Sequence, residues 1–157
     1  MEIERKFLVS AIPEDIESYP HSEIEQAYLN EQPVLRIRRR DDAFILTYKS
    51  KGMMVRQEHE FPLTQEAYEH LRSKADGNVI TKTRYCIPYG SHSIELDVFH
   101  NQMAPLVMAE VEFASTAEAE AFVRPSWFTT EVTYDSRYHN VNMALHPDTS
   151  IVTWRNT

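Results

Sequence analysis

The sequence predicts a single, mainly β domain, built from antiparallel strands with a few peripheral helices. Most of its 157 residues lie in short segments in which polar and apolar side chains alternate, the period-two pattern of strands with one buried face. Short polar turns, several with proline or glycine, separate neighbouring segments, as in antiparallel hairpins. The length fits one domain, and no linker, internal repeat or low-complexity tract divides the chain.

Nine segments carry the strand pattern, and the last of them carries it weakly. In order they are residues 2–9, 23–31, 34–41, 43–50, 54–62, 79–88, 92–99, 107–114 and 129–134. The turns expected between them fall at residues 30–33, 41–42, 51–52, 89–91 and 101–105. These turns contain the polar, proline and glycine residues that favour a change of chain direction.

Three helices are expected outside the strands. Thr64 is a suitable N-cap, because its hydroxyl can accept a hydrogen bond from the first turn, and this helix should run to about Ala75 and end at residues 76–77. Ser115 and Thr116 should cap a short helix that extends to Phe122. Residues 136–145 are the third candidate.

The composition argues against several classes of function. Only three glycines are present, and the glycine-rich phosphate loops of Rossmann and P-loop proteins are missing. The net charge of −8 disfavours nucleic acid as a partner, since binding to its backbone needs a basic surface. No window approaches the roughly 18 apolar residues of a membrane span. Charges interrupt the N-terminal residues where a signal peptide would lie, and the lone Cys86 cannot form an internal disulfide, so a cytoplasmic location is expected.

Charged side chains occupy one face of most predicted strands, and their signs segregate by strand. Residues two apart share a face of a strand, so the first strand places Glu2, Glu4 and Lys6 together. The basic groups that follow are Arg36, Arg38 and Arg40, then Lys49, and then Lys82 and Arg84. The acidic groups are Glu58 and Glu60, which share their face with Arg56, then Glu95 and Asp97, and then Glu110 and Glu112.

Two interpretations of this pattern compete. An ordinary sheet would point its charged face at solvent, and for a single pair such as Glu58 and Glu60 that is the better explanation. It is weaker for seven strands, because neighbouring like charges repel and protein surfaces usually mix the two signs. A charged face that lines a cavity explains the segregation.

If that face lies inside a closed barrel, eight carboxylates and at least six cations converge there. Removing unpaired charges from water is costly, so the interior must be wet and must hold compensating ions in use. Carboxylate clusters suit hard divalent metals, whereas arrays of Arg and Lys suit phosphate. The pattern therefore indicates a site for a metal ion together with a polyphosphate.

A series of short motifs resembles those of the CYTH, or triphosphate tunnel metalloenzyme, family. The chain opens with MEIERKFLV, which carries the family signature Glu2-x-Glu4-x-Lys6. LRIRR, TYK, RQEHE, TKTRY, IELDVF, AEVEF and RYHN follow in the family's order. A lone ExExK would be a weak signal, but the ordered series covers residues 2 to about 144, which is nearly the whole chain.

The resemblance implies one domain over residues 1–157, folded as a closed eight-stranded antiparallel β-barrel whose tunnel binds a triphosphate. It also implies Mg²⁺ or Mn²⁺ as the cofactor. By matching motif positions, the phosphate ligands would be Lys6, Arg36, Arg38, Lys49, Lys82 and Arg84. The metal ligands would be Glu2, Glu4, Asp97, Glu110 and Glu112.

The same matching suggests catalytic roles for Lys6, Tyr28, Glu58 and Glu60. Glu58 and Glu60 would help to hold a second metal or would place water. Tyr28 matches a tunnel tyrosine that is thought to pair with the first-strand lysine, so that Lys6 and Tyr28 together would orient the water or protonate the leaving group. The alternative for Tyr28 is an aromatic side chain packed in the core. Asn140 is expected to tie the last helix against the barrel end, and whether the C-terminal segment plugs the tunnel stays open.

Metal-dependent hydrolysis of inorganic tripolyphosphate is the activity that the resemblance favours, because the chain is minimal and has no insertion that would grip a base. A class IV-type adenylate cyclase, which converts ATP to cyclic AMP and pyrophosphate, and a thiamine triphosphatase are the alternatives. A non-catalytic polyphosphate-binding module is disfavoured by the complete charged set. The expected partner is a triphosphate-bearing small molecule rather than nucleic acid or a membrane. The outer faces of a barrel would allow a homodimer, although no motif specifies one.

Overall fold

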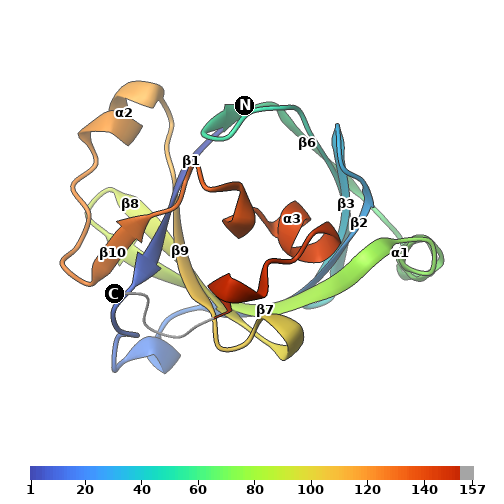
Figure 1. The fold of residues 1–157 in the computed structure, drawn as a ribbon, viewed down its shortest axis with the longest axis horizontal. Coiled ribbons are helices and arrows are strands. Elements are labelled where there is room, and N and C mark those ends of the chain that lie inside the picture. Colours follow the sequence, from blue (N-terminus) through green and yellow to red (C-terminus); the bar gives the residue numbers. More distant parts are fainter. Residues whose placement is uncertain (153–157) are drawn as a thin grey trace.

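The protein is a mainly antiparallel β structure with few helices, as predicted (Figure 1). A computed structural model describes residues 1–152. The strands are β1 (Glu2–Val9), β2 (His21–Asn30), β3 (Val34–Arg40), β4 (Ala43–Lys49), β5 (Val55–Arg56), β6 (Glu58–Pro62), β7 (Asp76–Tyr89), β8 (His92–Phe99), β9 (Val107–Glu112) and β10 (Phe128–Glu131). The helices are α1 (Gln65–Arg72), α2 (Thr116–Ala121) and α3 (Asn140–Leu145), with 3-10 turns η1 (Ile16–Ser18), η2 (Asn101–Met103), η3 (Ser136–Tyr138) and η4 (Thr149–Ile151). No helix within residues 1–152 is long and apolar enough to cross a membrane.

The strands pair in the order β10-β1-β9-β8-β7-β2-β3-β4-β6, while β5 lies off this path and pairs with β1. The predicted closure into an eight-stranded barrel is not confirmed, because β10 and β6, the two ends of the path, do not pair with each other. The predicted strand 54–62 is interrupted at Gln57. Its first part pairs with β1 and its second part with β4. One short segment of chain therefore pairs with strands near opposite ends of the strand order.

The predicted elements differ from the observed ones mainly at their ends. β1 and β8 have the predicted bounds, whereas β7 begins earlier, at Asp76, where a helix end was expected. Thr64 and Ser115 cap α1 and α2 as predicted, each accepting a hydrogen bond from a backbone N–H of the first helical turn. The expected helix over residues 136–145 is divided into η3 and α3, because His139 between them has an extended backbone.

The apolar strand faces point away from the charged ones and are covered from outside. Phe7 and Leu96 are fully buried in a cluster that includes Ala119 of α2. On the other side of the sheet, Ile37 packs in a cluster with Tyr68 of α1. Burial of these faces stabilises the sheet, and period-two alternation then turns Glu4 and its equivalents inward.

The inner face changes character along the strands, from charged to apolar. Leu8, Met108 and Phe99 continue the faces that carry Lys6, Glu110 and Asp97, and all three are buried in one cluster. Met143 and Ala144 of α3 belong to the same cluster, and Figure 1 shows the strands curving around this helix. The C-terminal helix therefore packs against the apolar end of the inner face and leaves the charged end free.

At Gly77, the backbone of β7 lies close to the backbone of α3. The φ of Gly77 is +66°, and a Cβ at this position would collide with the backbone carbonyl of Ala144. We expect Gly77→Ala to lower the free energy of unfolding by about 3 kcal/mol, since the substitution adds both backbone strain and a clash with the backbone of α3. Urea denaturation of the purified protein measures this loss.

Gly90 provides the matched control. It also has a positive φ, of +60°, but nothing lies within 4 Å of the position of an added Cβ. Gly90→Ala should therefore lower the free energy of unfolding by only about 1 kcal/mol, from backbone strain alone. Equal losses for the two variants would show that the contact with α3 does not stabilise the fold.

Candidate functional site

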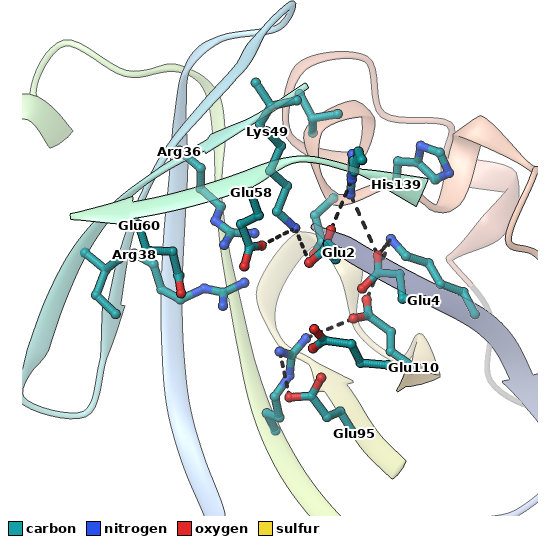
Figure 2. A pocket seen from close by; sticks show the side chains of 18 of the residues that line it. Glu2, Glu4, Arg36, Arg38, Lys49, Glu58, Glu60, Glu95, Glu110 and His139 are labelled. Carbon is teal, nitrogen blue, oxygen red and sulfur yellow. Dashed lines mark hydrogen bonds and ion pairs between the residues drawn. The ribbon is translucent and has the colours of Figure 1, made fainter. Parts of the chain in front are cut away.

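A cavity of about 210 Å³ lies at the charged end of the inner face (Figure 2). Seven carboxylates and seven cations line it, so its formal charge is balanced. The carboxylates are those of Glu2, Glu4, Glu58, Glu60, Glu95, Glu110 and Glu112. The cations are Lys6, Arg36, Arg38, Arg40, Lys49, Arg56 and Arg84, and Tyr28, His139 and Asn140 add polar groups.

Arg36 and Arg38 of β3 lie on one side of the cavity, opposite Glu2, Glu4 and Glu110 (Figure 2). Both are buried, with exposed fractions of 4% and 8%. Neither forms an ion pair with any of residues 1–152.

Their hydrogen-bond partners are neutral. Arg36 Nη2 donates to Thr47 Oγ1 at 3.3 Å, while its Nε has no hydrogen-bond partner among the described residues. Arg38 donates through Nε and Nη2 to Gln26 Oε1, at 3.1 and 2.8 Å. Burial, together with the charges of Arg36 and Arg84, lowers the pKa of Arg38 to about 9. Two buried positive charges without counter-ions create a strong demand for an anion.

Carboxylates face one another across β1, β9 and β8. Glu4 is paired in register with Glu112, and Glu110 with Glu95, so like charges lie directly opposite. Such pairs destabilise a sheet unless a cation lies between them. Burial raises the pKa of Glu112, and repulsion from Glu2 and Glu95 raises it further. Burial likewise raises the pKa of Glu95, although Arg84 partly offsets this effect.

Several carboxylates of the cavity form ion pairs with lysines of the same cavity. Lys6 Nζ lies 3.7 Å from both Glu4 Oε1 and Glu110 Oε1. Burial lowers the pKa of Lys6, but these two carboxylates outweigh it, and the net pKa is raised. Lys49 Nζ lies 3.1 Å from Glu2 Oε2 and 3.3 Å from a Glu58 oxygen (Figure 2).

The carboxylates have the chemistry that a divalent cation requires, but their side chains are not arranged to bind one in this structure. Oxygen donors on three neighbouring strands suit a hard metal ion, and repulsion from nearby carboxylates adds to the effect of burial in raising the pKa of Glu112. Yet no three His, Cys, Asp or Glu side chains within residues 1–152 converge in an arrangement that would already hold a metal. Glu2, Glu4 and Glu110 would have to turn toward the ion and away from Lys49 and Lys6, and Glu112 would have to turn toward it as well.

Two predicted ligands, Lys82 and Asp97, do not line the cavity. Both are fully buried, and they form an ion pair of 2.7 Å with each other. Asp97 also accepts a hydrogen bond of 2.7 Å from Arg84 Nε. Strand alternation places them on the inner face as predicted, but they lie deeper, toward the apolar end where Lys82 is paired in register with Phe99. Burial lowers the pKa of Lys82 to about 7, although Asp97 opposes this shift.

Tyr28 and Glu60, which were predicted to be catalytic, line the cavity and form hydrogen bonds with neighbouring side chains. The Tyr28 hydroxyl accepts a hydrogen bond of 3.2 Å from Gln26 Nε2, and it forms none with Lys6. Glu60 Oε2 accepts a long one, 3.4 Å, from Thr47 Oγ1. The expected Lys6–Tyr28 hydrogen bond is therefore not present, although both residues line the same cavity.

Four charged or titratable lining residues were not among the predicted ligands: Arg40, Arg56, Glu95 and His139. Arg40, Arg56 and Glu95 share strand faces with predicted ligands, so the alternation already contained their signal. His139 lies between η3 and α3, where no periodicity exists to reveal it. Its Nε2 lies 3.1 Å from the Thr133 carbonyl oxygen, and burial lowers its pKa, helped by the nearby charge of Lys6.

A second cavity, of about 410 Å³, adjoins the first. The two share Val34, Lys49, Arg56, His139 and Val141 as lining residues. The second cavity also borders residues 50–53 and η3. The charged cavity thus has a neighbouring space on the side of η3 and α3.

Comparison with known proteins identifies the family. The sequence model of the CYTH domain matches residues 1–138. An inorganic triphosphatase of Nitrosomonas europaea is 40% identical over 150 residues, which is 92% of this chain and 97% of that protein. An inorganic triphosphatase of Acetivibrio thermocellus is 32% identical, over 93% of this chain and 94% of its own length. A crystal structure of an inorganic triphosphatase superposes with a TM-score of 0.70 at 37% identity, covering 94% of this chain and 97% of that one. The chain therefore belongs to the CYTH domain family.

Proposed function

We propose that this protein is a metal-dependent triphosphatase that hydrolyses inorganic tripolyphosphate in the charged cavity. The observation that carries the proposal is the pair of buried guanidinium groups of Arg36 and Arg38, which lack carboxylate partners and lie opposite a carboxylate patch. An anion with several charged oxygens satisfies the arginines, and a cation satisfies the patch. Both curated relatives are named inorganic triphosphatases, and the similarity to them spans most of each chain.

In this proposal, Arg36 and Arg38 bind the phosphate chain first, because they need not release a carboxylate to do so. Arg84, Lys49 and Lys6 are paired with carboxylates, and they would turn to phosphate as those carboxylates turn to a metal ion. Lys82 and Asp97 would act behind them, since Asp97 fixes the guanidinium of Arg84 through two short hydrogen bonds.

Glu2, Glu4, Glu110 and Glu112 are the residues that would hold the divalent ion, Mg²⁺ or Mn²⁺. When bound, such an ion offsets phosphate charge and lowers the pKa of an attacking water. In the hydrolysis, water adds to a terminal phosphorus, the bridging P–O bond breaks, and orthophosphate and pyrophosphate leave. Positioning and charge neutralisation provide most of the acceleration in such a reaction.

The chain's own residues divide this work. The raised pKa of Lys6 keeps its ammonium group charged, so it stabilises phosphate oxygens rather than acting as a base. Glu58 and Glu60 line the cavity on its β6 side, where they would help to hold a second metal or would orient water. His139 is held neutral by its surroundings and contacts the Thr133 carbonyl, which leaves it no charge to offer the substrate.

The closed tunnel belongs to this proposal as well. Residues 55–62 pair with β1 through β5 and with β4 through β6, and only Gln57 separates the two pairings. This segment would complete a ring of strands around a bound triphosphate. A cytoplasmic location, supported by the lone Cys86, and a homodimer remain predictions.

Phosphate release from a panel of substrates tests the proposal. The panel contains tripolyphosphate, thiamine triphosphate, ATP and pyrophosphate, each with Mg²⁺ or Mn²⁺, and chromatography detects cyclic AMP. The fastest orthophosphate release should come from tripolyphosphate. Cyclic AMP and pyrophosphate from ATP would instead indicate a cyclase, and tight tripolyphosphate binding without turnover would indicate a binding module.

Arg36→Met should lower kcat/KM for tripolyphosphate by about 100-fold or more, because it removes a buried, uncompensated positive charge from the phosphate site. The ligand-free variant should be at least as stable as the wild type, since an apolar side chain of similar size avoids the cost of burying that charge. Steady-state kinetics and thermal unfolding measure the two effects.

Arg39→Met is the matched control, since Arg39 lies on the opposite face of the same strand, is exposed, and donates to the Asp41 carbonyl oxygen. Its kcat/KM should stay within about twofold of wild type, as for other exposed charges. Similar losses in both variants would mean that the general charge of β3, rather than the buried guanidinium, supports activity.

Glu112→Gln should raise the metal concentration needed for half-maximal activity by about tenfold, because it removes an anionic oxygen ligand. Since the pKa values of Glu95 and Glu112 are raised, a fall in pH protonates them before ordinary glutamates. Only the ionised form binds a cation, so the wild-type metal requirement should rise as the pH falls and level off at higher pH. Metal titrations at several pH values measure both effects.

Glu120→Gln, at an exposed position of α2, makes the same chemical change away from the cavity and should leave the metal requirement unchanged. An unchanged metal requirement in Glu112→Gln would remove that carboxylate from the proposed metal site.

A further inference from the structure

We propose that Gln26 is a positioning residue that sets the anion affinity of the cavity, by orienting Arg38 and Tyr28 without neutralising either. This inference deepens the proposed function and rests on it. Gln26 lies on β2 with no exposed surface, and it does not line the cavity itself. A polar side chain so deeply buried must have its hydrogen-bonding groups satisfied, and all of them are directed at the site.

Gln26 is the centre of a buried hydrogen-bond network. Its Oε1 accepts two hydrogen bonds from Arg38, at 3.1 and 2.8 Å. Its Nε2 donates to Tyr28 Oη at 3.2 Å and to Asn140 Oδ1 at 3.0 Å. Asn140 Oδ1 also accepts from Lys82 Nζ at 3.2 Å.

The donor and acceptor of each hydrogen bond between these side chains can be assigned from the chemistry of Arg38. Arg38 can only donate, so Gln26 must present its oxygen to Arg38 and its amide nitrogen to Asn140. The Gln26 amide group is then left to donate to the Asn140 oxygen. The two amides are therefore held in one orientation.

This assignment determines whether the Tyr28 hydroxyl acts as a donor or as an acceptor in the cavity. Its hydroxyl accepts from Gln26 and makes no other hydrogen bond with residues 1–152, so its own hydrogen is available to donate. Tyr28 lines the cavity, where the acceptor would be a phosphate oxygen. Gln26 thereby makes Tyr28 a donor to the anion.

The neutral amide also leaves the positive charge of Arg38 without a counter-ion. Arg84 and Arg56 are each paired with carboxylates, at 2.7 and 3.1 Å, which lowers their attraction for another anion. Gln26 fixes Arg38 through Nε and Nη2 with no opposing charge, leaving Nη1 for the ligand. A glutamate of the same shape would bind Arg38 as an ion pair and would accept the Tyr28 hydrogen.

Gln26→Glu is therefore the decisive variant, because it changes the charge and hydrogen-bond direction with almost no change in shape. We expect the affinity of the metal-free protein for tripolyphosphate, measured by titration calorimetry, to fall about tenfold or more. KM should rise more than kcat falls. Gln26→Met, which removes the acceptor but adds no charge, should weaken binding less than Gln26→Glu and keeps the test usable if the glutamate variant folds poorly.

Gln102→Glu is the matched control. Gln102 is exposed on η2 and lines neither cavity, so the same added charge should leave affinity and KM unchanged. A purely structural role for Gln26 would move the melting temperature without a selective change in KM.

The outcomes separate this inference from the proposed function. Equal tripolyphosphate affinity in wild type, Gln26→Glu and Gln26→Met would overturn the role of Gln26 while leaving the hydrolase proposal intact. Wild-type binding that is weakened by Gln26→Glu, but without turnover of tripolyphosphate, would support the role of Gln26 and overturn the hydrolase. Absence of wild-type binding would overturn both.

Discussion

Two guanidinium groups of the cavity are buried without a counter-ion among residues 1–152, and the remainder of the fold must offset that cost. Arg36 and Arg38 are held by Thr47 and Gln26, both neutral, where most other cations of the cavity have carboxylates. A protein interior tolerates such charges only if the surrounding fold is stable enough to absorb their cost and a ligand removes it in use. The stability must come from elsewhere in the molecule.

That stability comes from the opposite strand faces and from the C-terminal helix. Phe7 and Leu96 are buried under α2, and Ile37 is buried beside α1, so the sheet has its apolar core outside the charged face. Met143 closes the apolar end of the inner face, in the same cluster as Phe99. The charged cavity is thus supported on two sides by ordinary hydrophobic packing, which fixes the strands that position its arginines.

Period-two alternation was enough to predict which face each strand residue occupies, as the opposite environments of Arg38 and Arg39 illustrate. It could not predict which inner-face residues along a strand reach the cavity. Lys82 and Asp97 were predicted to be ligands, but they do not line the cavity. At their end of the sheet α3, which is distant in the sequence, packs against the strands, and its Asn140 contacts Lys82. The interruption at Gln57 could not be predicted either, because it arises where the segment changes its pairing from β1 to β4. His139 belongs to the RYHN motif, but its position beside the cavity depends on tertiary packing, which the motif alone does not reveal.

The balanced charge of the cavity constrains how it is loaded. Seven carboxylates and seven cations face one another, so either ligand alone leaves an excess of one sign, and a metal ion would also have to break ion pairs. In the proposed site, a metal ion would draw Glu2 and Glu4 from Lys49 and Lys6, and the freed ammonium groups would then need an anion. A triphosphate would supply that anion, and its own charges would need the metal. Each ligand would therefore favour the binding of the other, for the same electrostatic reason that leaves Arg36 and Arg38 unpaired: the proposed site is complete only when it holds both.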